Sequence, residues 1–112
     1  NSLITNRRIN WIIGLEYKTT SEQLKNIKDQ IEKFIKSSDD FSTKPDTILS
    51  VKIDQFAASS IDIRLICFTT TKHYLEWMSV KDKLAIEIKN IVEKNNASFA
   101  FPSTSVYVEK NA

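Results

Sequence analysis

The sequence predicts an α+β domain in which two helices cover one face of an antiparallel sheet. The chain has 112 residues, the size of a domain with a single hydrophobic core. Its apolar residues recur with a period of two in some stretches and with a helical period of about 3.6 in two others. These stretches follow one another as strand, helix, strand, strand, helix and strand, with a short extra C-terminal strand. Such a βαββαβ order is typical of the ferredoxin-like two-layer sandwich.

Composition narrows the class of protein. Lysine and arginine total 16 against 14 acidic residues, and 41% of residues are hydrophobic, as in globular domains rather than disordered tails. The arginine pair Arg7 and Arg8, without interleaved aromatic residues, is a weak signal for nucleic acid, and we expect no such partner. No apolar run approaches the roughly 20 residues that cross a bilayer, so we expect a soluble piece. Asn1 in place of a starting methionine fits a fragment of a longer protein.

A change of period separates the first strand from the first helix. Gly14, the only glycine, falls inside the strand and predicts a bulge or the close approach of another element. Thr20 and Gln23 have the spacing of a capping box, so a helix is expected to begin there. The alternating face of the strand is formed by Ile9, Trp11, Ile13, Leu15 and Tyr17, and the helical stripe by Leu24, Ile27, Ile31, Phe34 and Ile35.

Two further strands form a predicted hairpin. Leu49, Val51 and Ile53 alternate after the polar segment that contains Pro45. The next alternating stretch covers about residues 61–68, and only a short AASS connection separates the two. So short a connection predicts antiparallel pairing.

A second helix and a last strand complete the order. The segment FTTTKHYLEW fits either a loop or an early helical turn, whereas Ser79 and Asp82 make a second candidate capping box. Phe99 and Phe101 alternate in the last strand, and Pro102 cannot donate to a ladder. The stripe of the second helix is formed by Trp77, Val80, Leu84, Ile88, Ile91 and Val92, and we expect the core to form around Trp11, Phe34 and Leu84.

No set of residues has the makeup of a catalytic or metal site. Cys67, the only cysteine, alternates with apolar residues, so we interpret it as buried filler rather than a nucleophile activated by His73, the only histidine. Asp39 and Asp40 lie in a polar loop without further ligands at suitable spacing. We therefore expect no enzyme activity, no cofactor and no metal.

Three segments, in the same order and without large gaps, resemble the carboxy-terminal cytoplasmic domain of the small-conductance mechanosensitive ion channel family. The resemblance runs roughly from Ile4 to Glu109. Its most specific parts are the Arg-Arg pair before the first strand, LEYKTT before the first helix, and alanine-phenylalanine-proline after the second helix. The segments are ITNRRINWIIGLEYKTTSEQLKNI, VKIDQFAASSIDIRLICFT and YLEWMSVKDKLAIEIKNIVEKNNASFAFPSTSVYVE.

The resemblance implies a function of position rather than of catalysis. In this family, membrane helices form a tension-gated pore, a β domain lies beneath it, and the carboxy-terminal domain builds the lower part of a hollow vestibule, usually in a sevenfold homo-oligomeric ring. The domain would then be an oligomerisation scaffold and an ion and solute filter. It would belong to a multi-pass protein, on the cytoplasmic side of the bacterial inner membrane.

The resemblance also implies how the chain divides. Residues 1–8 would be a linker from an upstream β domain, 9–102 the ferredoxin-like domain, and 103–112 a C-terminal strand and tail. An interdomain salt bridge is expected at the arginine pair, and the C-terminal strand would serve another assembly or, alternatively, pack as an edge strand on its own domain. The expected interface residues are Arg7, Arg8, Pro102, Thr104, Val106, Tyr107 and Val108.

Two other classes compete with a channel domain. One is a free-standing module of the same fold that senses or is regulated by a small ligand at a sheet edge or dimer interface. The other is an enzyme of acylphosphatase-like topology, which needs an anion-cradling loop that a single glycine inside a strand does not supply. A start codon near residue 1 would favour the ligand-sensing module, and upstream membrane spans would favour the channel.

Overall fold

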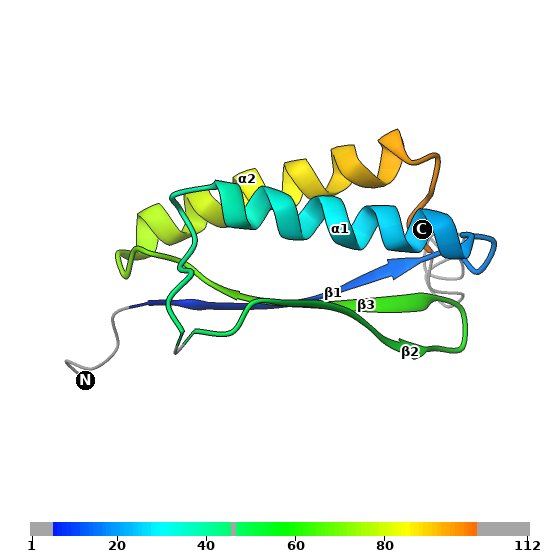
Figure 1. The fold of residues 1–112 in the computed structure, drawn as a ribbon, viewed down its shortest axis with the longest axis horizontal. Helices are drawn as coiled ribbons and strands as arrows, with labels where there is room; N and C mark the ends of the chain where they lie inside the picture. Colours follow the sequence, from blue (N-terminus) through cyan, green and yellow to red (C-terminus); the bar gives the residue numbers. More distant parts are fainter. Residues whose placement is uncertain (1–5, 46, 101–112) are drawn as a thin grey trace, which may run out of the picture.

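The computed structural model describes residues 6–45 and 47–100. Both helices lie on one face of the sheet, side by side, and leave its other face uncovered (Figure 1). This arrangement confirms the predicted α+β two-layer fold. The elements in chain order are β1 (Arg8–Leu15), α1 (Ser21–Ser37), β2 (Ser50–Phe56), β3 (Ile61–Phe68) and α2 (Tyr74–Lys94).

The three strands form one antiparallel sheet in the order β1-β3-β2. β3 is the central strand, and Leu65 lies opposite Trp11 on one side and Val51 on the other. At the outer edge of β1, Phe99 forms an antiparallel bridge with Leu15. Residues 98–100 thus take the place of the fourth strand in the split βαβ layout. The predicted extra strand beyond residue 102 lies outside the described residues.

Apolar side chains of the sheet and both helices meet between the two layers. Every second residue of β3 is buried, as the alternation predicts. Leu84 is fully buried, whereas Trp11 and Phe34 are half-buried and pack against the core. Burying a large aliphatic side chain contributes about 1.5–3 kcal/mol, so this layer is the main source of stability. The buried apolar residues are Ile9, Ile13, Leu15, Leu24, Ile27, Ile31, Ile35, Phe41, Val51, Ile61, Ile63, Leu65, Cys67, Val80, Leu84, Ile88, Ile91 and Val92.

Helix α1 begins where its capping box predicts. Thr20 Oγ1 accepts a hydrogen bond from Gln23 N at 3.1 Å, and Gln23 Oε1 accepts one from Thr20 N at 2.7 Å. The amide of the same glutamine donates to the carbonyl oxygens of Asn95 at 2.8 Å and Asn96 at 3.2 Å. Gln23 therefore accepts from a backbone N–H at the start of α1, and its amide links α1 to the residues that follow α2.

Helix α2 begins at Tyr74, so the capping box predicted at Ser79 and Asp82 is wrong. The N–H of Trp77 already donates to the carbonyl oxygen of His73 at 2.9 Å, which is a helical hydrogen bond. Ser79 and Asp82 consequently lie inside the helix, where Ser79 N–H has a helical partner and needs no cap. Of the two interpretations of FTTTKHYLEW, the early helical turn is confirmed for Tyr74 onward.

Two details of the first strand differ from prediction. β1 ends at Leu15, and Tyr17 is exposed rather than in the core, because the chain turns through a hydrogen bond from Thr19 N to Glu16 O of 3.0 Å. Gly14 marks no bulge, since the pairing of β1 with β3 is continuous through it. The irregularity lies instead in β2, between residues 53 and 55.

The close approach predicted at Gly14 is modest. A Cβ atom built on this residue would lie 3.5 Å from side-chain atoms of Ser60 and Asp62, an ordinary van der Waals distance. Space alone therefore does not require glycine at this position.

Candidate functional site

The two arginines predicted at a domain junction lie in different surroundings. Arg8 is the exposed first residue of β1. Arg7 precedes the strand; its Nε donates to the carbonyl oxygen of Lys72 at 2.8 Å, and its guanidinium lies 5.8 Å and 5.3 Å from the ring centroids of Tyr74 and Trp77. Within residues 6–45 and 47–100, neither arginine forms an ion pair with a carboxylate. The interdomain salt bridge stays a prediction.

The start of β1 is bound to the loop that precedes α2. Asn6 Nδ2 donates to the carbonyl oxygen of Thr69 at 2.6 Å, and Thr69 N donates to that of Arg7 at 2.9 Å. Thr69 is fully buried, and its hydroxyl donates to the carbonyl oxygen of Thr71 at 2.7 Å. Together with the bond from Arg7 to Lys72, these contacts hold the first described residues beside the start of α2.

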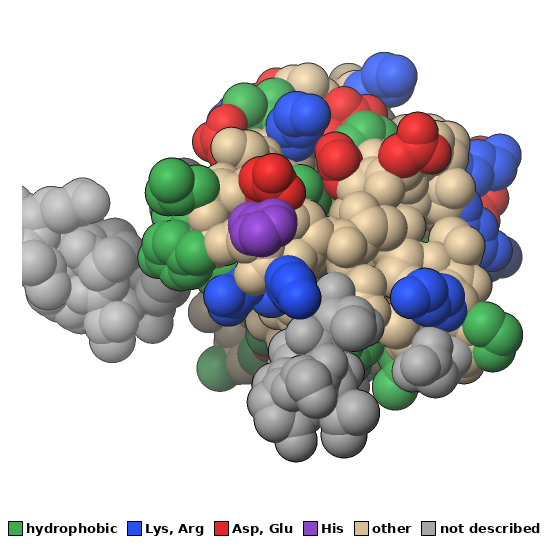
Figure 2. All heavy atoms as spheres, turned by 90° about the vertical axis from the view of Figure 1, so that its left-hand side faces the viewer, with side chains coloured by type: hydrophobic (Ala, Val, Ile, Leu, Met, Phe, Trp, Pro, Cys, Tyr) green, Lys and Arg blue, Asp and Glu red, His purple; other side chains and the backbone are tan. Residues whose placement is uncertain are grey.

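Exposed apolar side chains cluster at the start of α2. Tyr74, Leu75 and Met78 are 57%, 78% and 42% exposed, and their spacing places them together on the helix surface. We call these three residues the α2 N-terminal patch. Beside the patch, Trp77 is half-buried, with Lys81 Nζ 4.0 Å from its ring centroid. Figure 2 views this end of the molecule, where apolar side chains lie next to the single histidine and to cationic side chains.

The hydrogen-bond ladder on the outer edge of β1 reaches Ala100. Glu16 N donates to Ser98 O at 3.1 Å, and Ala100 N donates to Gly14 O at 3.0 Å. In an antiparallel ladder the next residue to donate toward β1 is two positions further, at Pro102, which has no N–H. This register supports the prediction that pairing stops there. The predicted interface residues Pro102, Thr104, Val106, Tyr107 and Val108 themselves lie outside the described residues.

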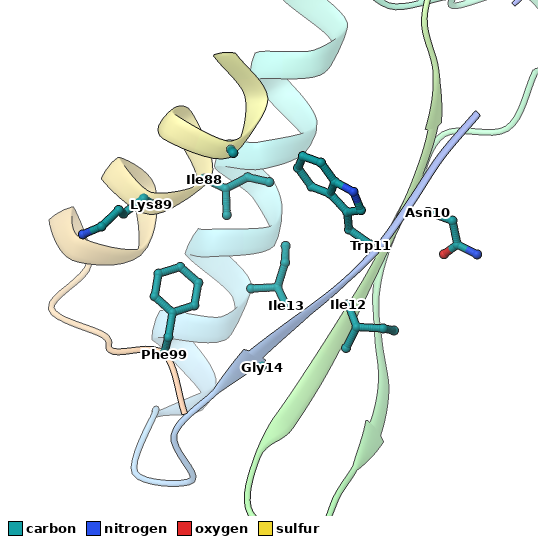
Figure 3. Close-up of a pocket in the computed structure, with 9 residues that line it drawn as sticks. Asn10, Trp11, Ile12, Ile13, Gly14, Ile88, Lys89 and Phe99 are labelled. Carbon is teal, nitrogen blue, oxygen red and sulfur yellow. The ribbon is translucent and has the colours of Figure 1, made fainter. Parts of the chain in front are cut away.

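A groove of about 470 Å³ lies between the outer edge of β1 and α2. Trp11 and Ile13 point from β1 toward α2, whereas Ile12 points away (Figure 3). The one charged residue that lines the groove, Lys89, forms an ion pair with Glu93. A largely apolar groove of this size suits the binding of apolar groups. The lining residues are Asn10, Trp11, Ile12, Ile13, Gly14, Ala85, Ile88, Lys89 and Phe99.

The side chains considered as a nucleophile and its base lie in different environments. Cys67 is 1% exposed and faces the core, where burial raises the pKa of its thiol from 9.0 to about 12. His73 is exposed and lies at the N-cap of α2. The interpretation of Cys67 as buried filler is confirmed. In the described ranges, no group of three or more His, Cys, Asp and Glu side chains could hold a metal ion.

Cys67 should react slowly with thiol reagents in the folded protein. Burial excludes the reagent, and the raised pKa leaves the thiol protonated at pH 8, so we expect modification with a maleimide to be at least about a hundredfold slower than in urea. The rate is measured by mass spectrometry with and without denaturant. Equal rates in the two conditions would contradict the burial of this side chain.

Apolar periodicity does not reveal the α2 N-terminal patch, because its three residues precede Ser79, where the capping pattern predicts that the helix begins. A signal was nevertheless present. Tyr74 and Met78 stand four residues apart, as do Trp77 and Lys81, which is the spacing of neighbours on a helix surface. Arg7, by contrast, joins them only through the tertiary fold, since 65 residues separate it from Lys72.

Comparison with known proteins identifies a family. Residues 9–99 match the family model described as the mechanosensitive ion channel MscS, C-terminal. An uncharacterized MscS family protein of Aquifex aeolicus (strain VF5) is 36% identical over 93% of this chain and 28% of its own length. The low conductance mechanosensitive channel YnaI of Escherichia coli (strain K12) is 34% identical over 95% of this chain and 30% of its own length. The chain thus spans less than a third of these curated relatives.

Solved structures share the fold. The cryo-EM structure of Arabidopsis thaliana MSL1 A320V matches with a TM-score of 0.80 and 15% identity, over 91% of this chain and 38% of that chain. The crystal structure of Helicobacter pylori MscS in its closed state matches with a TM-score of 0.66 and 19% identity, over 88% of this chain and 36% of that chain. Neither helix in the described part of this chain is long and apolar enough to cross a membrane. The family model covers most of the chain, and the chain therefore belongs to the MscS family of mechanosensitive ion channels, of which it carries the C-terminal domain.

Proposed function

We propose that this chain is the vestibule domain of a mechanosensitive channel, a scaffold for subunit assembly and a filter for ions and solutes below a tension-gated pore. The observation that carries the proposal is the match of residues 9–99 to the C-terminal domain of a channel family. Relatives of the chain are more than three times its length, which leaves room for a pore elsewhere in them. No step of catalysis is part of this function.

The proposed assembly is a sevenfold ring on the cytoplasmic side of the bacterial inner membrane. The ladder at β1 supports release of the C-terminal segment from the sheet, because the next position that would donate to β1 after Ala100 is Pro102, which has no N–H. A segment released from the sheet can pair with symmetry-related copies, and Val106, Tyr107 and Val108 give it the apolar side chains for such contacts. We accordingly propose that residues 103–112 are an assembly strand and tail, and that residues 1–8 are the linker from an upstream β domain.

Electrophysiology of the full-length protein tests the channel function. The reading frame upstream of Asn1 is first searched for apolar runs of about 20 residues followed by a β-rich segment. The protein is then reconstituted in liposomes, and suction is applied to excised patches. We expect unitary currents whose open probability rises with membrane tension. Protein-free liposomes are the control, and silent patches containing inserted protein would contradict the proposal.

The groove between β1 and α2 favours a second candidate, a free-standing module that binds a small apolar ligand. Its volume of about 470 Å³ is in the range of small-molecule sites, and its lining is largely apolar. A start codon within a few residues of Asn1 would remove the pore and leave this candidate. A thermal-shift screen of apolar ligands, with the exposed lining residue changed in Ala85→Lys as the variant expected to lose binding, would then be the relevant measurement.

A further inference from the structure

We infer that the α2 N-terminal patch is the docking surface for the domain that precedes residue 6 in the same polypeptide. That domain would present apolar side chains bordered by carboxylates. The inference rests on the proposed function, because it requires an upstream domain. The proposed function does not say where the two domains contact each other, and this inference identifies the contact surface on the present domain.

The first argument is the concentration of apolar surface at one point. Tyr74, Leu75 and Met78 are all exposed large apolar residues within the first turns of a single helix, and Leu75 is 78% exposed. Scattered exposed apolar residues are normal, but a contiguous group bordered by charge is typical of an interaction site. Further along the same helix, Ile86 is also exposed, at 56%, but lies more than two turns from Met78.

The second argument is the position of the chain that arrives at this patch. The N-terminal end of the described chain and the start of α2 lie at the same end of the molecule (Figure 1). Asn6 and Arg7 are fixed there by hydrogen bonds to Thr69 and Lys72. An upstream domain joined through the proposed linker of residues 1–8 is therefore held close to the patch, and so short a connection gives it a high effective concentration there.

The third argument is charge. Within the described ranges, Arg7 and Lys81 form no ion pair, although Arg7 lies over the rings of Tyr74 and Trp77 and Lys81 lies over that of Trp77. A carboxylate on the docked surface would pair with these two cations, so an acidic border is the complementary chemistry.

Cysteine accessibility tests the inference. Leu75→Cys is made in the full-length protein and in the 112-residue chain, with Ile86→Cys as the matched exposed control on the same helix. Buried Cys67 contributes little background, and other reactive cysteines of the full-length protein are replaced. We expect maleimide labelling at position 75 to be at least about tenfold slower in the full-length protein than in the short chain, and labelling at position 86 to be similar in both.

A photo-crosslinker attached at position 75 identifies the occupant. A crosslink to the upstream domain of the same polypeptide supports the inference, whereas a crosslink to residues 6–100 of another copy overturns it. Equal labelling at position 75 in both proteins also overturns it, as does protection of both positions. Protection in the 112-residue chain by vesicles of phosphatidylcholine and phosphatidylglycerol alone would assign the patch to a membrane instead. Tension-activated currents from the same full-length protein report the proposed function separately, so a conducting channel with a freely labelled patch refutes only the docking.

Discussion

Replacing Leu65 by alanine is expected to lower the free energy of unfolding by about 2–5 kcal/mol. Leu65 is 0% exposed and lies at the centre of β3, opposite Trp11 and Val51 on the neighbouring strands. Removal of its side chain loses apolar burial and leaves a cavity that both layers enclose, so the surroundings collapse only partly. Urea unfolding followed by circular dichroism measures the change, with the midpoint expected to fall at a nearly constant slope.

The matched control is Ile12→Ala. Ile12 is of similar size but is 46% exposed, and it points away from α2. Its truncation removes little buried surface, so we expect a loss below about 1 kcal/mol. If Leu65→Ala costs no more than Ile12→Ala, the layer between sheet and helices is not the core that stabilises this domain.

Lysine at both Val106 and Val108 is expected to disrupt assembly of the full-length protein while leaving the melting transition of the 112-residue chain unchanged. In the proposed ring, these side chains contact neighbouring copies, and burying an unpaired ammonium costs several kcal/mol. Each 1.4 kcal/mol changes an equilibrium about tenfold, so association should weaken by more than about a hundredfold. Light scattering after size-exclusion chromatography measures assembly, and scanning calorimetry of the 112-residue chain measures its stability.

The matched control adds the same charge to the same segment. Ser103→Lys with Ser105→Lys places two lysines at the alternate positions of the predicted strand, so assembly should be much less affected. The competing interpretation makes a different prediction: a strand packed on its own domain would lower the melting temperature of the short chain as well as assembly. Equal losses in the two measurements would therefore favour an edge strand.

Most of the secondary structure could be predicted from the sequence, because apolar periodicity reports local backbone geometry. β3 has the bounds that its alternation predicts, and α1 begins at the capping box of Thr20 and Gln23. Prediction failed where two local signals competed. The Ser79 and Asp82 spacing resembles a cap, yet α2 begins at Tyr74, where the helical ladder is already formed. Inside a longer helix, residues with capping spacing have no free backbone N–H groups to cap, so the pattern does not mark a helix start.

The candidate site was predictable only in part. The sequence pointed to the arginine pair, but the contacts of Arg7 with Lys72, Tyr74 and Trp77 depend on residues about 65 positions away. The same applies to Phe41, which follows the polar residues Asp39 and Asp40 in the sequence and is buried beside Phe34. Such contacts depend on sheet register and tertiary packing. The spacing of apolar residues along the chain does not show which distant residues will meet.

By itself, the sequence determined the element order, the α+β fold class and the family of this protein, because these follow from periodicity and from extended segments of similar sequence. Only the tertiary structure decided which surfaces are left for partners. The register of residues 98–100 on β1 places the next donor position at Pro102, and the bonds of Asn6 and Arg7 bring the start of the chain to an exposed apolar patch. Exposure is a property of the packed whole: the same apolar residue is core or interface according to what the fold places over it.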